Sequence, residues 1–217
     1  MDYVSDLDII SAGLVPYEEA WDRQRQLHAA RVAGDIPDTV LLLEHPPVYT
    51  ATRRTQPWAL PNDGTPVVQT DRGGDITWHG PGQLVGYPIV ALPGRRDVVA
   101  YVRRVEAMLI SVCADLGLPG QRIKGRSGVW VIGGGPDRKV AALGLRVSQG
   151  VAMHGFALNC DPDLRAFDLI APCGYTDVGA TSLSRELGRD VTVAEALPVV
   201  QRHLSELVTI AADPIAV

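Results

Sequence analysis

The chain has 217 residues, of which 46% are hydrophobic, and its formal net charge is -5. A chain of this size and composition can bury a full core, so we predict one domain over residues 1–217. Acidic and basic residues are interspersed, which argues against a nucleic-acid surface, and no run of about 18 apolar residues could cross a membrane. Because the N-terminus lacks a basic stretch followed by an apolar run, we expect a cytoplasmic protein.

Apolar alternation and short apolar runs predict four strands in the first half of the chain, over residues 6–13, 38–45, 66–71 and 83–92. Two helices are expected, one from Pro16 to about Arg31 and one from about Asp97 to Leu116. Residues 53–65 show little periodicity and many turn formers, which is typical of a surface loop.

The densest strand signal lies in the second half, over residues 127–134, 139–147 and 151–159. Glycine-rich turns separate these runs, so we predict an antiparallel meander with the three glycines at 133–135 at a hairpin tip. A closing amphipathic helix is expected over residues 192–211. The predicted class is α+β, a mixed β-sheet with flanking helices.

The segment RGGDITWHGPGQ, residues 72–83, is the least explained by packing alone. Glycine adds no core and costs conformational entropy, so a chain concentrates it where Cβ atoms would collide or where φ must be positive. We interpret the segment as a wall of a binding site. A tight turn between two strands remains the alternative.

Lysine usage singles out Lys139. Of 20 basic residues only two are lysines, Lys124 and Lys139, so arginine is this chain's usual solvated cation. Lysine differs from arginine in carrying a compact amine that can lose its proton when it is desolvated. Chance at a hairpin end remains the plain alternative.

The three cysteines are too few and too irregular for a disulfide framework, and we expect free thiols. Cys113 falls in an apolar-periodic helix and is expected in the core, whereas Cys173 lies between a proline and a glycine. If Cys173 faced Lys139 at about 4 Å, the attraction would be about 4 kcal/mol at an effective dielectric near 20. That is enough to ionise a thiol, but sequence spacing cannot show the contact.

His79 and His154 each precede a glycine. They are either the base and orienting group of a Cys-His pair or hydrogen-bonding anchors for loops around a pocket. No metal-ligand spacing occurs, so we expect no metal. We expect His28, His45 and His203 at the surface or at caps. Phosphate-binding fingerprints are missing from the sequence, and no nucleotide cofactor is expected.

Five ordered motifs together carry a resemblance: LLLEHPPVYT, DRGGDITWHGPGQLVGYPI, RKVAALGLRV, HGFALN and APCGYTD. Over about residues 10–190 they closely resemble the lipoyl(octanoyl) transferase family, whose members move an octanoyl group from acyl carrier protein to a lysine of lipoyl domains. One departure is the run from Ala51 to Arg54, where the family usually has a glycine, which puts the shape of that loop in doubt.

The resemblance implies a fold shared with the catalytic domains of lipoate and biotin protein ligases. It also implies that Cys173 carries an acyl thioester and that Lys139 lowers its pKa and moves the proton. No cofactor is implied. The acyl and pantetheine site would comprise Arg72, Gly73, Gly74, Asp75, Ile76, Thr77, Trp78, His79, Ala142, Leu143, Gly144, His154, Gly155, Phe156 and Ala157.

The implied partners are octanoyl-acyl carrier protein as donor, and as acceptors the lipoyl domains of 2-oxoacid dehydrogenase complexes and the glycine cleavage H protein. We expect a monomer. From the residues themselves, backbone amides of a strand turn near residues 142–144 are a candidate oxyanion site. A basic rim for acidic partners would include Arg53, Arg54, Arg95, Arg96, Arg103, Arg104, Arg122, Lys124 and Arg126.

Three other functions are left open. An ATP-dependent lipoate or biotin ligase on the same scaffold would need no nucleophilic cysteine. A non-catalytic acyl-binding or carrier-docking module would use the same groove without transfer. A papain-like hydrolase is less favoured because no Asn or Asp is evident to orient His79 or His154.

Overall fold

The computed structural model describes residues 7–92, 97–170 and 178–208. Its helices are α1 Tyr17–Ala33, η1 Pro57–Ala59, α2 Val98–Asp115, α3 Arg165–Asp168, α4 Leu183–Leu187, α5 Val193–His203 and η3 Leu204–Leu207. Its strands are β1 Leu7–Leu14, β2 Asp38–Glu44, β3 Val48–Ala51, β4 Val67–Gln69, β5 Thr77–His79, β6 Gln83–Ile89, β7 Gln121–Ile123, β8 Arg126–Val131, β9 Asp137–Ser148, β10 Val151–Asn159 and β11 Val178–Ala180. In the described part of the chain, every helix is too short or too polar to cross a membrane.

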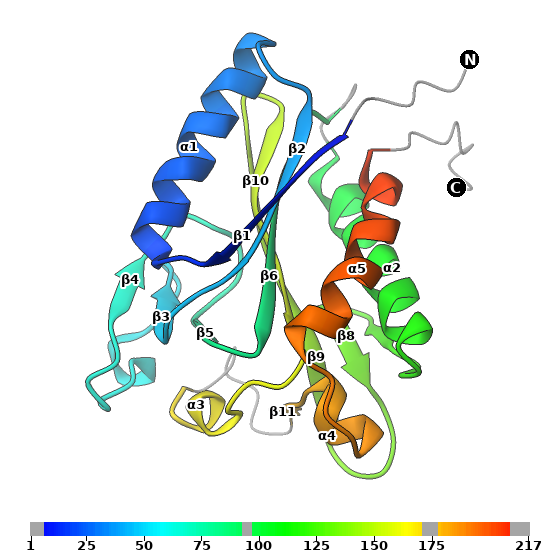
Figure 1. Cartoon of the computed structure of the whole chain (residues 1–217). Coiled ribbons are helices and arrows are strands. Elements are labelled where there is room, and N and C mark those ends of the chain that lie inside the picture. The colour runs from blue at the N-terminus through cyan, green and yellow to red at the C-terminus, as the bar shows by residue number, and fades with distance from the viewer. Residues whose placement is uncertain (1–6, 93–96, 171–177, 209–217) are drawn as a thin grey trace.

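The main sheet is mixed, with strand order β1-β2-β6-β10-β9-β8-β7. The meander of β8, β9 and β10 is antiparallel, as predicted. One edge of β9 pairs with β8, and its other edge pairs with β10 along most of its length and with β11 at residues 137–139. A second sheet of β4, β3 and β5 lies beside the main sheet (Figure 1). The predicted α+β class is therefore confirmed.

Helices cover both faces of the main sheet, with α1 on one face and the pair α2 and α5 on the other (Figure 1). Alternate residues of a strand point to opposite faces. In β2, Val40 and Leu42 pack on the α2 and α5 side, whereas Leu41 and Leu43 pack on the α1 side. The apolar run of β2 is thus explained by burial on both faces.

The helix boundaries follow local signals. Helix α1 begins after Pro16, which fits the first turn because its missing N–H is not needed there, and it ends at Gly34 in the left-handed conformation. The Asp97 side chain accepts a hydrogen bond from the Ala100 backbone N–H and caps α2. The closing helix runs only to His203 and continues as a 3-10 turn, with Leu204 and Leu207 fully buried.

One local expectation is wrong. Residues 142–144 lie in the middle of β9 and form no turn, so the oxyanion site expected at such a turn lacks its basis. Within this stretch, Gly144 is approached closely by the backbone of Gly73. The segment 72–83 is more than the tight turn that was the alternative, since Thr77–His79 forms β5 and pairs with β3.

Candidate active site

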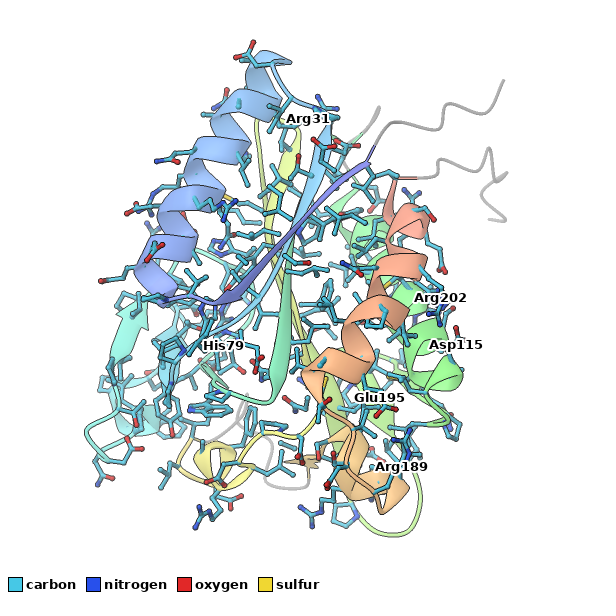
Figure 2. The ribbon with its side chains drawn as sticks, viewed as in Figure 1. Arg31, His79, Asp115, Arg189, Glu195 and Arg202 are labelled. Atoms are coloured by element: carbon cyan, nitrogen blue, oxygen red, sulfur yellow. The ribbon has the colours of Figure 1, made fainter. Side chains whose placement is uncertain are left out.

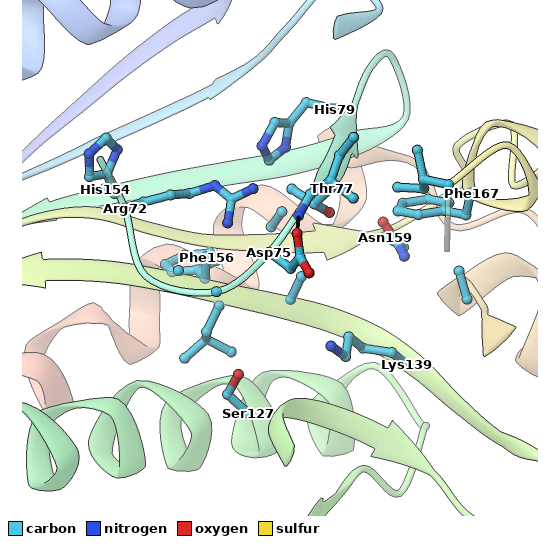
Figure 3. Close-up of a pocket in the computed structure, with 18 of the residues that line it drawn as sticks. Arg72, Asp75, Thr77, His79, Ser127, Lys139, His154, Phe156, Asn159 and Phe167 are labelled. Atoms are coloured by element: carbon cyan, nitrogen blue, oxygen red, sulfur yellow. Dashed lines mark hydrogen bonds between the residues drawn. The ribbon is translucent and has the colours of Figure 1, made fainter. Parts of the chain in front are cut away.

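A cavity of about 550 Å³ opens on the α1 side of the main sheet. Its floor is the central part of β9 and β10, and residues 72–77 run across it as a wall (Figure 3). The two ends of the cavity differ in chemistry. Lys139 projects into one end, and Arg72 and His154 lie together at the other (Figure 3).

Glycine and alanine residues of β9 and β10 form the floor of the cavity. Gly144 pairs with Gly155 and Ala142 pairs with Ala157 across β9 and β10, so four small residues share the cavity face of the sheet. The neighbouring residue Phe156 packs into the main core and also borders the cavity. The strands therefore carry bulk on one face and leave space on the other.

The arginine-glycine-glycine run lies directly against β9. The Gly73 N–H donates to the Leu145 carbonyl at 3.0 Å. A Cβ added at Gly73 would lie 2.9 Å from the Leu145 carbonyl oxygen, and one added at Gly144 would lie 2.8 Å from the Gly73 oxygen. Two backbones can approach this closely only because both positions are glycine.

Arg72 is held by β3 while its side chain lines the cavity. Its Nη2 donates to the Thr50 carbonyl at 2.6 Å and to Thr50 Oγ1 at 3.0 Å. The cation affects nearby titratable groups, because it contributes to lowering the pKa of both His79 and His154. Arg72 thus makes this end of the cavity positive while the rings beside it stay neutral.

His79 is buried and belongs to a chain of hydrogen bonds across three strands. Burial, with His45 next, lowers its pKa to about 3, so the ring is neutral at pH 7. Its Nδ1–H donates to Gln83 Oε1 at 2.7 Å, and Gln83 Nε2 donates to Asn159 Oδ1 at 2.8 Å. Asn159 Nδ2 donates to the Thr181 carbonyl at 2.9 Å. These contacts favour the anchoring role for His79 over that of a base.

His154 is oriented by a carboxylate that sequence reasoning missed. Its Nε2–H donates to Asp71 Oδ1 at 2.7 Å, and Arg146 pairs with the other oxygen of Asp71. Burial, followed by Arg72 and Arg146, lowers the pKa of His154. The statement that no Asp is placed to orient these histidines is therefore wrong for His154. The two residues are 83 positions apart in the sequence, and no local pattern links them.

His45 and His28 are buried, so the surface placement expected for them is wrong. The Nδ1–H of His45 donates to the Val15 carbonyl at 2.7 Å, and the Tyr87 hydroxyl donates to its Nε2 at 2.7 Å. Burial lowers the pKa of His45 to about 4. His203 is partly exposed at the end of α5 and contacts Asp115 and Glu206.

Lys139 projects into the cavity from the start of β9. Its ammonium lies over the Trp130 ring, with Nζ 4.6 Å from the ring centroid. Strand β11 pairs with β9 at this point, with Ala180 opposite Lys139, and the Thr181 N–H donates to the Lys139 carbonyl at 3.0 Å. The hydrogen-bond chain from His79 through Asn159 therefore ends on the backbone next to Lys139.

The two cysteines that the structure describes are inert. Cys113 and Cys160 are completely buried, as expected for Cys113, and burial raises the pKa of each thiol to about 12. Cys173 lies outside the described residues, as do Arg95 and Arg96. Among the residues that the structure describes, no group of His, Cys, Asp and Glu has the arrangement of a metal site.

Most of the predicted site residues line one cavity. They are Arg72, Gly74, Asp75, Ile76, Thr77, His79, Lys139, Ala142, Leu143, Gly144, His154, Gly155, Phe156 and Ala157. Gly73 instead contacts the backbone of β9, and Trp78 packs with Tyr49, Ile76 and Ile170 in a separate apolar cluster. Of the expected basic rim, Arg54 and Arg126 line the cavity, while Arg103 and Arg122 pair with the buried Glu106.

Sequence reasoning missed several lining residues, including Tyr17, Tyr87, Trp130, Asn159, Phe167 and Ile170. One of them was predictable. The hairpin tip at Gly133–Gly135 was recognised, so Trp130 could be expected near the start of β9, and in the structure its partner there is Lys139. Asn159 and Tyr87 gave no comparable signal, because their contacts join distant strands.

The comparisons with known proteins agree with this geometry. The profile of the lipoyl protein ligase A/B catalytic domain family matches residues 16–205. An octanoyltransferase of Salinispora tropica is 64% identical over 205 residues, which cover 94% of this chain and 96% of the relative. An octanoyltransferase of Streptomyces coelicolor is 51% identical in an alignment that covers 94% of this chain and 94% of the relative.

Two solved structures show the fold. A bipartite lipoate protein ligase from Thermoplasma acidophilum superposes with a TM-score of 0.69 at 12% identity, covering 97% of this chain and 88% of that one. A biotin protein ligase from Aquifex aeolicus gives 0.52 at 14% identity, covering 93% and 68%. The expected fold is thereby confirmed. The family match and the much higher identities to the first two relatives place the chain in the lipoyl protein ligase A/B catalytic domain family, and within it among the octanoyltransferases.

Proposed function

We propose that the protein transfers an octanoyl group from octanoyl-acyl carrier protein to a lysine of a lipoyl domain through a thioester on Cys173. The acceptors are the lipoyl domains of 2-oxoacid dehydrogenase complexes and the glycine cleavage H protein. The observation that carries the proposal is a single cavity in which Lys139 projects beside a floor of small residues, in a member of the octanoyltransferases.

Elimination supports Cys173 as the nucleophile. Cys113 and Cys160 are buried with raised pKa values, so their thiols stay protonated and out of contact with substrate. The described residues on either side of the segment that carries Cys173, Ile170 and Gly179, both line the cavity. Gly179 belongs to β11, which pairs with β9 next to Lys139.

The chemistry is a double displacement. The Cys173 thiolate attacks the carbonyl carbon of the octanoyl thioester, a carbon–sulfur bond forms, and the bond to the carrier sulfur breaks as that sulfur takes a proton. The acceptor lysine, as a free amine, then attacks the new thioester, the bond to Cys173 breaks, and the amide nitrogen loses a proton. Thioester exchange and amide formation from a thioester need no nucleotide. The Lys139 ammonium stabilises the thiolate at each stage.

The charge of the cavity fits an acidic carrier. Among the described lining residues, Arg54, Arg72, Arg126 and Lys139 are basic and only Asp75 and Asp168 are acidic, although the whole chain has a net charge of -5. A local positive potential of this kind raises the rate of encounter with an anionic partner more than it raises affinity. The rate of transfer should accordingly fall as ionic strength rises.

Intact-protein mass spectrometry with octanoyl-acyl carrier protein, in the absence of ATP, tests the proposal. The wild type should gain one octanoyl increment, and a lipoyl domain added later should remove it. Cys173→Ala should gain none, while Cys113→Ala, at a buried thiol of the same kind, should label like the wild type. An octanoyl increment on Cys173→Ala would contradict the assignment.

The same experiment separates the alternatives. An ATP-dependent ligase would act on free octanoate only with ATP and would retain its activity in Cys173→Ser. A non-catalytic module would bind the carrier without ever gaining the increment. Both outcomes are distinct from that of a transferase, which acts without ATP and loses turnover with the thiol.

A further inference from the structure

Within the meander, the Lys139 side chain contacts an aromatic face. Trp130 stands directly opposite Lys139 in the β8 and β9 pairing, and the ammonium lies 4.6 Å from the centroid of its ring. Cations within about 6 Å of a tryptophan centroid are attracted by the negative potential of the ring face, and more strongly where water is excluded. Trp130 is 2% exposed, so its face is largely shielded from solvent.

The aliphatic part of Lys139 is also confined. Gly128, two residues before Trp130 on β8, has a φ of +120°, and a Cβ there would lie 3.2 Å from Lys139 Cε and 2.6 Å from the Ala141 carbonyl oxygen. Only glycine fits this position. The Gly128 N–H donates to Glu106 Oε1 at 3.0 Å, which fixes the strand from the side of α2.

The neighbouring arginines of β8 and β9 each lie close to a carboxylate. Arg138 pairs with Glu186 at 2.8 Å, and Arg126 lies 3.9 Å from Asp137. A register shift between Val129 and Trp130 brings Trp130 opposite Lys139 in the pairing of β8 and β9. The lysine stem is thus placed by Gly128 and its ammonium by Trp130.

We propose that Trp130 is a positioning residue that keeps the Lys139 ammonium charged and fixed at the cavity wall through a cation–π contact. This inference rests on the proposed function, in which Lys139 stabilises the thiolate of Cys173. An aromatic face stabilises a protonated amine more than a neutral one. Lys139 therefore serves as a fixed positive charge through the transfer cycle, and the protons move between the substrates and the reacting sulfur and nitrogen atoms.

The decisive test is stepwise fluorination of Trp130. Tryptophan with one to four ring fluorines, incorporated only at position 130, loses the negative potential of its face while it keeps nearly the same shape. The rate of octanoyl transfer should fall with each fluorine, to about one tenth for the tetrafluoro ring. Trp130→Leu should fall about as far, and Trp130→Tyr should recover part of the rate.

Matched controls separate charge from shape. The same series at Trp58, which is 72% exposed on the loop after β3, should leave the rate unchanged. In a Lys139→Met background the series at position 130 should be flat, because no cation remains to be weakened. A rate that does not depend on fluorination in the wild-type background would overturn the proposal.

An unfolding measurement tests the contact without any transfer. A cycle of Trp130→Leu, Lys139→Met and the double variant should give a coupling of about fivefold in the unfolding equilibrium constant. No coupling would overturn the cation–π contact itself. If the coupling is present but Lys139→Met transfers octanoyl at the wild-type rate, the proposed function fails instead, so the two failures are distinguishable.

Discussion

The two faces of the same strands in the centre of the sheet serve different ends. On the face under α2 and α5, β9 and β10 present Leu145, Phe156 and Leu158 to a continuous apolar core. On the α1 face the alternate positions of the same strands are small, and the cavity occupies the space that they leave (Figure 2 shows the packed side chains, Figure 3 the cavity). Because successive residues of a strand point to opposite faces, one set of residues packs the core and the alternate set borders the cavity.

The polar groups divide in the same way. The α1 side buries Gln24, His28, His45 and His79, whereas the main buried charge on the α2 side is Glu106, which is neutralised by arginines. Burying a polar group costs free energy unless it is hydrogen-bonded. Buried polar side chains on the α1 side therefore call for a reason other than stability, and the cavity on that side is one. The comparison predicts that substitutions on the two faces will affect different observables.

Substitutions on the core face should lower the free energy of unfolding. Leu158→Ala removes a completely buried side chain and should lower the free energy of unfolding by about 3 kcal/mol. Octanoyl transfer per folded molecule should stay near the wild-type rate. Urea unfolding and activity at a fixed folded fraction check this pair of outcomes, and an unchanged midpoint would show that the face is not the main core.

Substitutions on the cavity face should lower the efficiency of octanoyl transfer. Ala142→Phe places a ring into the cavity and should lower kcat/KM for octanoyl donors about 100-fold, because displacing three to four methylenes costs about 0.8 kcal/mol each. A butyryl donor should be affected much less. Equal losses for both donors, or a large loss of stability, would contradict the assignment of this face to the acyl chain.

The buried histidines should make stability depend on pH. His45 and His79 have pKa values lowered to about 4 and about 3, so the unfolded chain binds more protons below pH 6.5 and stability falls as pH falls toward those values. Between pH 7 and pH 5 each ring should account for about 2 kcal/mol. His45→Gln should flatten the profile by that amount.

The control for that profile lies outside the site. Hydrogen bonds to Glu206 and, next, to Asp115 raise the pKa of His203, which therefore stabilises the fold below pH 6.5 and loses its effect as pH rises. His203→Gln should not flatten the profile and should steepen it slightly. If His45→Gln left the pH profile unchanged, the neutral buried ring would be disproved.

Substitutions in the hydrogen-bond chain from His79 to Thr181 should give the smallest effect. Asn159→Leu keeps the volume and leaves the Thr181 carbonyl without its donor, at a cost of about 1 kcal/mol in stability. Asn159→Asp, which keeps the acceptor for Gln83 but cannot donate, should show the same loss at the Thr181 carbonyl. Amide hydrogen exchange at Thr181 checks the local effect, and unchanged protection there would contradict it.

The features that could be predicted from sequence are local in the chain. The meander followed from alternating apolar residues and glycine turns, and α2 followed from its periodicity and the Asp97 cap. The glycines of residues 72–83 indicated a close backbone approach without revealing which strand they approach. The interpretation of this segment as a site wall rested on the conformational cost of glycine.

The features that could not be predicted are contacts between distant segments. Asp71 reaches His154, and Asn159 reaches Thr181, through pairings that appear only when the sheet order is known. His45 follows a strand and two prolines follow it, which is typical of a surface loop, yet Tyr87 and Val15 enclose it. Burial of a lone polar residue has no periodic signal in the sequence.

The central claim is that a fixed cation at residue 139 keeps the thiol of residue 173 ionised. The pH dependence of alkylation by iodoacetamide measures it directly, since the other two thiols are buried. The account predicts a midpoint well below the ordinary thiol value of about 8.5 in the wild type and a return to about that value in Lys139→Met. The same midpoint in both proteins would contradict it.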